Sequence, residues 1–93
     1  MTKVKVGGMT YTVLYKSDVN IDGVKRYGTC DRENMVIEIR DSMNKPLTDL
    51  TLIHEIVHAI DFEYCIDMTE SQVEQMANGL YQVLVDNEFE EAP

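Results

Sequence analysis

The feature that most constrains this chain is a pair of histidines, four residues apart, inside an apolar run from Thr51 to Ile60. The run contains the pattern His-Glu-x-x-His, formed by His54, Glu55 and His58. On a helix, residues four apart lie on the same face with Cβ atoms roughly 6 Å apart, so both imidazoles can reach one metal ion. Glu55 is rotated by about 100° from His54 and flanks such an ion without binding it. This arrangement is typical of metallopeptidases, in which a carboxylate beside the metal takes a proton from water.

The alternative interpretation is purely structural: a pair of core histidines that have hydrogen-bond partners. The sequence has no other histidine, and these two lie among Leu, Ile and Val. Burial of two imidazoles without partners is unfavourable. The pattern therefore favours metal ligation over two structural histidines.

Length and charge restrict the function classes. The 93 residues predict one domain, residues 1–93, because the chain is too short for two. A net charge of −9 argues against nucleic acid as a direct partner, since phosphate binding needs clustered Lys and Arg. No apolar run is long enough for a membrane span, and no signal-peptide pattern is visible. We therefore expect a cytoplasmic protein in which Cys30 and Cys65 are free thiols. The oligomeric state is not predicted.

The residue pattern predicts an α+β fold with an N-terminal antiparallel sheet of about four strands. Alternating apolar residues and the pair Gly7-Gly8 indicate a first hairpin. A second hairpin follows a polar stretch that we expect to be a loop. The expected hairpins pair residues 3–6 with 9–15 and residues 26–30 with 35–40, and the loop covers residues 16–25.

Two helices follow the sheet, an active-site helix at about 47–64 and a second helix at about 70–87. The second helix begins with a capping-box pattern, Thr69 followed three residues later by Gln72. Each helix has a stripe of apolar residues at helical spacing. The expected core stripes are Leu50, Ile53, Val57, Ile60 and Tyr64 on the first helix, and Val73, Met76, Ala77, Leu80 and Leu84 on the second.

A catalytic zinc ion normally has three protein ligands, and without a third histidine the last one should be a carboxylate. Asp61 has a short side chain one turn beyond His58; it is better suited to accept an imidazole N–H or to be a solvated acid. Glu74 lies next to the core stripe of the second helix and is the favoured candidate. Glu70 lies in the first turn of that helix, where an acid also simply favours the helix dipole.

The segments His54–Ala59 (His-Glu-Ile-Val-His-Ala) and Glu74–Asn78 (Glu-Gln-Met-Ala-Asn) resemble the ImmA/IrrE-type small gluzincin metallopeptidases. That family carries His-Glu-x-x-His-Ala and then Glu-x-x-Ala-Asn on the next helix. The resemblance covers residues 47–87 and implies that Glu74 is the third zinc ligand and that the sheet packs on the active-site helix. The chain is similar to a minimal, phage-like version of the family. After Asn78 the chain departs from the usual Phe-Ala continuation, and the regulatory roles of larger relatives are not carried over.

The expected activity is hydrolysis of a peptide or protein substrate by a zinc-activated water, with Glu55 as general base. The oxyanion donor is left open among Tyr27, Tyr64 and Tyr81. The edge of the strand that ends at Arg40 could hold an extended peptide by β-augmentation. The alternative is a zinc-binding interaction or regulatory module that uses the same scaffold without cleaving.

Overall fold

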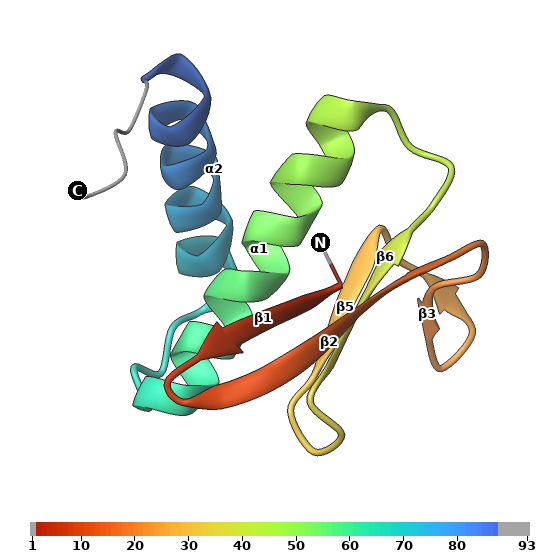
Figure 1. Cartoon of the computed structure of the whole chain (residues 1–93), viewed down its shortest axis with the longest axis horizontal. Helices are drawn as coiled ribbons and strands as arrows, with labels where there is room; N and C mark the ends of the chain where they lie inside the picture. The colour runs from red at the N-terminus through yellow and green to blue at the C-terminus, as the bar shows by residue number, and fades with distance from the viewer. Residues whose placement is uncertain (1, 88–93) are drawn as a thin grey trace.

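Helix α1 (Lys45–Tyr64) lies between a four-stranded sheet on one side and helix α2 (Glu70–Asp86) on the other (Figure 1). The structure is a computed structural model that describes residues 2–87. The predicted α+β class is confirmed, and both helices begin and end within two residues of their predicted bounds. Neither described helix combines the length and the apolar character needed to cross a membrane.

The sheet contains strands β1 (Lys3–Val6), β2 (Met9–Lys16), β5 (Gly28–Asp31) and β6 (Val36–Arg40) in the order β1-β2-β6-β5. The two predicted hairpins are confirmed, because β1 pairs with β2 and β5 pairs with β6 in antiparallel fashion. The prediction of a wholly antiparallel sheet is wrong at its centre, where β2 and β6 are parallel. Sequence patterns determine the pairing within each hairpin but not the side on which two hairpins join. Here the second strands of both hairpins meet, and they run in the same direction.

The stretch predicted as a loop contains a small hairpin of β3 (Asn20–Ile21) and β4 (Val24–Lys25). Its turn is formed by Asp22 and Gly23, both with positive φ, as two-residue hairpin turns require. The side chain of Asn20 accepts a hydrogen bond from the Gly23 N–H. Two-residue strands have too little alternating pattern to be seen in the sequence.

The core has two parts. The larger part lies between the sheet and α1, and the smaller one lies between the two helices. Of the expected stripe residues on α2, Val73 and Ala77 are buried and Met76 between them is exposed; those further along are exposed where α2 leans away from α1 (Figure 1). The buried residues are Val6, Tyr11, Val13, Ile37, Ile39 and Ala59 in the first part and Val57, Val73 and Ala77 in the second; the exposed stripe residues are Tyr64, Met76, Leu80 and Leu84.

The connection between the helices, residues 65–69, determines where α2 begins. Cys65 ends α1 in the left-handed conformation and donates its N–H to the Asp61 carbonyl. The Asp61 carboxylate accepts the N–H of Met68 at 3.1 Å. Thr69 then caps α2 with the predicted capping box. These contacts turn the chain back sharply and bring Glu70 beside α1.

Candidate metal centre

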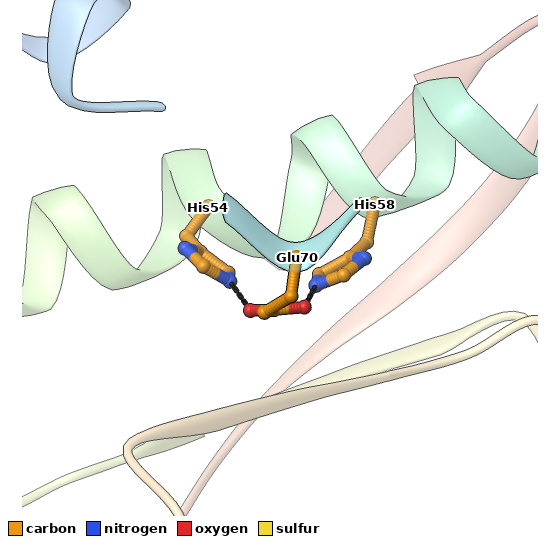
Figure 2. A group of neighbouring side chains, drawn as sticks. All are labelled: His54, His58 and Glu70. Carbon is orange, nitrogen blue, oxygen red and sulfur yellow. Dashed lines mark hydrogen bonds and ion pairs between the residues drawn. The ribbon is translucent and has the colours of Figure 1, made fainter. Parts of the chain in front are cut away.

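Three side chains from the two helices converge on one point (Figure 2). His54 and His58 lie one turn apart on α1, and Glu70 is the first residue of α2. The Glu70 carboxylate lies 2.9 Å from the Nε2 atom of His54 and 3.1 Å from the Nε2 atom of His58. One ligand atom from each residue falls within 4.8 Å of the others, so this group could hold a metal ion.

The histidine rings are held by their neighbours on α1. The two ring centroids are 5.0 Å apart in an edge arrangement, and the His58 ring stacks on Phe62. Both imidazoles are mostly covered, with 24% and 22% of their side-chain surfaces exposed, whereas the Glu70 side chain is 67% exposed. The nitrogen donors are therefore fixed, and the oxygen donor can adjust.

The charge state of His58 suits ligation. Burial lowers the pKa of this imidazole, although the negative charge of Glu70 opposes the effect. A neutral imidazole keeps the lone pair that a metal ion needs. His58 is thus prepared for an ion near neutral pH.

Glu55 lies on the side of α1 that faces the sheet and is only 6% exposed. Burial raises the pKa of its carboxyl group to about 7; the charge of Glu70 adds to this rise, and that of Arg26 opposes it. The strand β5 comes close to Glu55 because residue 28 is glycine. A Cβ atom at Gly28 would lie 2.7 Å from Thr51 Cγ2 and 3.1 Å from Glu55 Cγ. Any side chain at residue 28 would therefore displace the carboxylate or the strand.

The third member of the group is the carboxylate of Glu70, and the structure does not bring Glu74 into the group. Glu74 lies one turn further along α2, where its exposed side chain lines the same cavity. The assignment of Glu74 as third ligand, implied by the family resemblance, stays a prediction, while the geometry favours Glu70. The Asp61 carboxylate accepts the Met68 N–H and so holds the connection between the helices, a role that the sequence analysis did not consider.

A cavity of about 850 Å³ opens over the centre. Its walls come from α1, from α2 and from the segment that joins β4 to β5. Of the three tyrosines considered as oxyanion donors, Tyr27 lines this cavity and the other two do not. Sequence reasoning missed Arg26 and Gly28, which also line it. A glycine within a strand pattern is a sign of close backbone approach, and that signal was available for Gly28.

Comparison of the chain with protein-family models, with curated proteins and with solved structures finds no match. The resemblance to the ImmA/IrrE-type peptidases therefore rests on the motif residues alone.

Proposed function

We propose that this protein is a zinc-dependent metallopeptidase that hydrolyses peptide or protein substrates. The observation that carries the proposal is the convergence of His54, His58 and Glu70 in the cavity that also contains Glu55. Two histidines at i and i+4 with a carboxylate as third ligand form the donor set of a catalytic peptidase zinc. Both cysteines are free, which fits a reducing compartment, and we place the activity in the cytoplasm.

The three residues fit a zinc ion. Zinc bonds of about 2.0–2.1 Å in tetrahedral geometry place neighbouring ligand atoms roughly 3.3 Å apart. The Glu70 oxygens lie 2.9 Å and 3.1 Å from the imidazole nitrogens, so a small outward displacement of this exposed side chain makes room. Three protein ligands leave a fourth position for water or substrate, as in catalytic sites. When bound, the ion supplies a Lewis acid that polarises the scissile carbonyl and makes a water molecule more acidic.

Glu55 moves the protons in this mechanism. Its carboxylate accepts the proton of the attacking water and then donates it to the nitrogen of the leaving amine. In the metal-free protein burial raises the pKa of Glu55 to about 7; a bound cation would lower this pKa and favour the carboxylate form that accepts the proton from water.

Strand β5 offers the edge along which a peptide can lie. Within the described residues it is one of the two outer strands of the sheet, and Gly28, Thr29 and Cys30 line the cavity. The prediction that the strand ending at Arg40 could hold a peptide is wrong, because this strand, β6, is paired on both sides. An extended peptide that adds to β5 by main-chain hydrogen bonds would pass beside Glu55.

A second candidate function is a metal-binding interaction module that does not cleave. It is favoured by the apolar surface that α2 exposes, formed by Met76, Leu80, Val83 and Leu84. Exposed apolar patches of this kind mark interaction sites. In this alternative the metal centre only fixes the position of α2.

The first test is metal content. We expect about one zinc per chain in the wild type and in Glu74→Ala, and much less in Glu70→Ala and His58→Ala. Glu74→Ala is the matched control, since it removes a carboxylate from the same cavity and the same helix. Loss of metal in Glu74→Ala and not in Glu70→Ala would return the third ligand to Glu74. No zinc in the wild type after zinc is added would refute the proposal.

The second test is hydrolysis of a peptide library by the zinc-loaded wild type and by Glu55→Gln. We expect turnover by the wild type and a loss of at least about a hundredfold in the variant, with zinc content unchanged. Zinc binding without any hydrolysis by the wild type would instead favour the interaction module.

A further inference from the structure

The basic residues of this chain are confined to one part of the molecule. All eight Lys and Arg residues lie within residues 1–45, while residues 46–93 contain acids and no Lys or Arg. The titratable groups that the helices bring to the cavity are therefore three acids and the two histidines. Its positive charge comes from the opposite wall, where Lys25 ends β4 and Arg26 follows it.

These two cations have no acidic partner within the described residues, although acids outnumber bases in the chain by 17 to 8. The ion pairs of Lys and Arg found in residues 2–87 involve other bases, namely Lys16 with Glu38, Arg32 with Glu63 and Lys45 with Asp49. Both Lys25 and Arg26 are exposed, and both line the cavity. Unpaired cations at an opening into a cavity are available to a ligand.

The backbone that carries Arg26 is held on both sides. Its N–H donates to the carbonyl of buried Val19 at 2.9 Å, and its carbonyl accepts from Nη2 of Arg40 at 2.9 Å. The next carbonyl, that of Tyr27, accepts the Arg40 N–H, and the Arg40 guanidinium lies over the Tyr27 ring. The main chain is thus fixed while the Arg26 side chain is left free. Arg26 and the proposed base Glu55 line the same cavity.

We propose that Lys25 and Arg26 recognise a carboxylate of the substrate, so that the enzyme selects peptides with an acidic group next to the cleaved bond. This inference rests on the proposed function and adds a substrate class to it. The carboxylate can belong to an Asp or Glu side chain or to a free C-terminus. The negative charge of the whole protein would suggest a basic substrate, but the charges that line this wall of the cavity are positive.

The chemistry of the pair suits this role. The Arg guanidinium binds a carboxylate through two parallel hydrogen bonds, and Lys adds a flexible point charge. A substrate that covers the opening excludes water and strengthens the attraction. Hydrogen bonds between charged groups of this kind change affinity by about ten- to a hundredfold.

The test uses fluorescein-labelled octapeptides with a central Phe-Leu, flanked by Ala and by a single Glu, Gln or Lys on either side. Each peptide is made with a free and with an amidated C-terminus. Binding is measured on zinc-loaded Glu55→Gln protein, and cleavage on the wild type. The same measurements are made with Lys25→Gln and Arg26→Gln added. Lys5→Gln is the matched control, because it removes an equal charge from β1 at the opposite edge of the sheet.

We expect the Glu peptide to bind about ten- to a hundredfold more tightly than the Gln peptide and the Lys peptide to bind most weakly. The preference should largely disappear in Arg26→Gln and persist in Lys5→Gln. A preference that follows the free C-terminus, and not Glu, would assign the carboxylate to the chain end. Equal binding of all peptides, or a preference that survives loss of both cations, would overturn the inference.

The two proposals fail separately. Cleavage without any preference for a carboxylate refutes the recognition by Lys25 and Arg26 and leaves the peptidase activity intact. Selective binding of the acidic peptides without cleavage of any peptide refutes the peptidase activity and leaves the recognition intact.

Discussion

Replacement of Glu55 by Gln should change how the stability of the metal-free protein depends on pH. The pKa of Glu55 is raised from its ordinary value of 4.5 to about 7 in the folded protein, mainly by burial. Below about pH 4.5 both the folded and the unfolded states hold the proton, so Glu55 adds no pH dependence. Between about pH 4.5 and pH 7 the folded state keeps a proton that the unfolded chain releases. Stability therefore falls as the pH rises through this range.

The size of this effect follows from the two pKa values. At about 1.4 kcal/mol for each pKa unit, the difference between 4.5 and about 7 corresponds to an upper limit of about 3.5 kcal/mol. Glu55→Gln removes this penalty because its side chain does not ionise. Relative to the wild type, the variant should therefore gain about 2–3 kcal/mol between about pH 5 and about pH 8. A constant difference in hydrogen bonding or packing cancels in that comparison.

The assay is urea unfolding, followed by circular dichroism, of both proteins after treatment with a chelator. Metal must be removed because a bound cation favours the ionised carboxylate. Glu74→Gln is the control, since its side chain is exposed and its solvation changes little on folding. If the free-energy difference between the wild type and Glu55→Gln were the same at both pH values, the raised pKa of Glu55 in the metal-free protein would be refuted.

Three further perturbations test the surroundings of the site. Gly28→Ala should lower stability by about 1–3 kcal/mol, measured by urea unfolding, because its Cβ atom would lie 2.7 Å from Thr51 Cγ2; an unchanged unfolding midpoint would contradict the close approach of β5. Thr69→Ala should lower the free energy of unfolding by about 1 kcal/mol, because it removes the cap of α2. It should also weaken zinc binding in a chelator competition. Unchanged zinc affinity would show that the start of α2 does not need the cap. Cys65 is exposed and should react quickly with a thiol reagent, while Cys30, which is half-buried and whose pKa is raised to about 12 mainly by burial, should react more slowly; equal rates by mass spectrometry would contradict the raised pKa of Cys30.

The elements that the sequence predicts well are those whose signal is local. Both hairpins and both helices have periodic patterns and end signals within their own residues, and the capping box at Thr69 is formed as expected. The pairing of His54 with His58 is local as well, because helical geometry alone places them on one face. The parallel contact between β2 and β6 joins two hairpins that are separated by a polar stretch, and no local pattern encodes it.

The prediction overestimated how much of the apolar stripe on α2 is buried, and the reason is related. A helical stripe shows which residues can be buried, but the length of the contact depends on the angle between the helices. Val73 and Ala77 pack on α1 and are buried, whereas Met76 between them is exposed, and Leu80 is exposed where α2 leans away from α1 (Figure 1). Arg26 escaped notice because it lies between two short strands, and its place beside the cavity depends on how the β3–β4 hairpin folds back against β5.

The choice between Glu70 and Glu74 reduces to the register of α2 against α1. The two acids are about one turn apart on the same face of α2, a separation of about 6 Å along the axis, so periodicity favours neither. What selects Glu70 is the point at which α2 begins, and this is determined by the connection that Asp61 holds through the Met68 N–H. Zinc content after Glu70→Ala and Glu74→Ala therefore measures the register of the two helices as well as the ligand set. Asp61→Ala should shift or loosen that register and lower zinc affinity without removing any of the three proposed ligands.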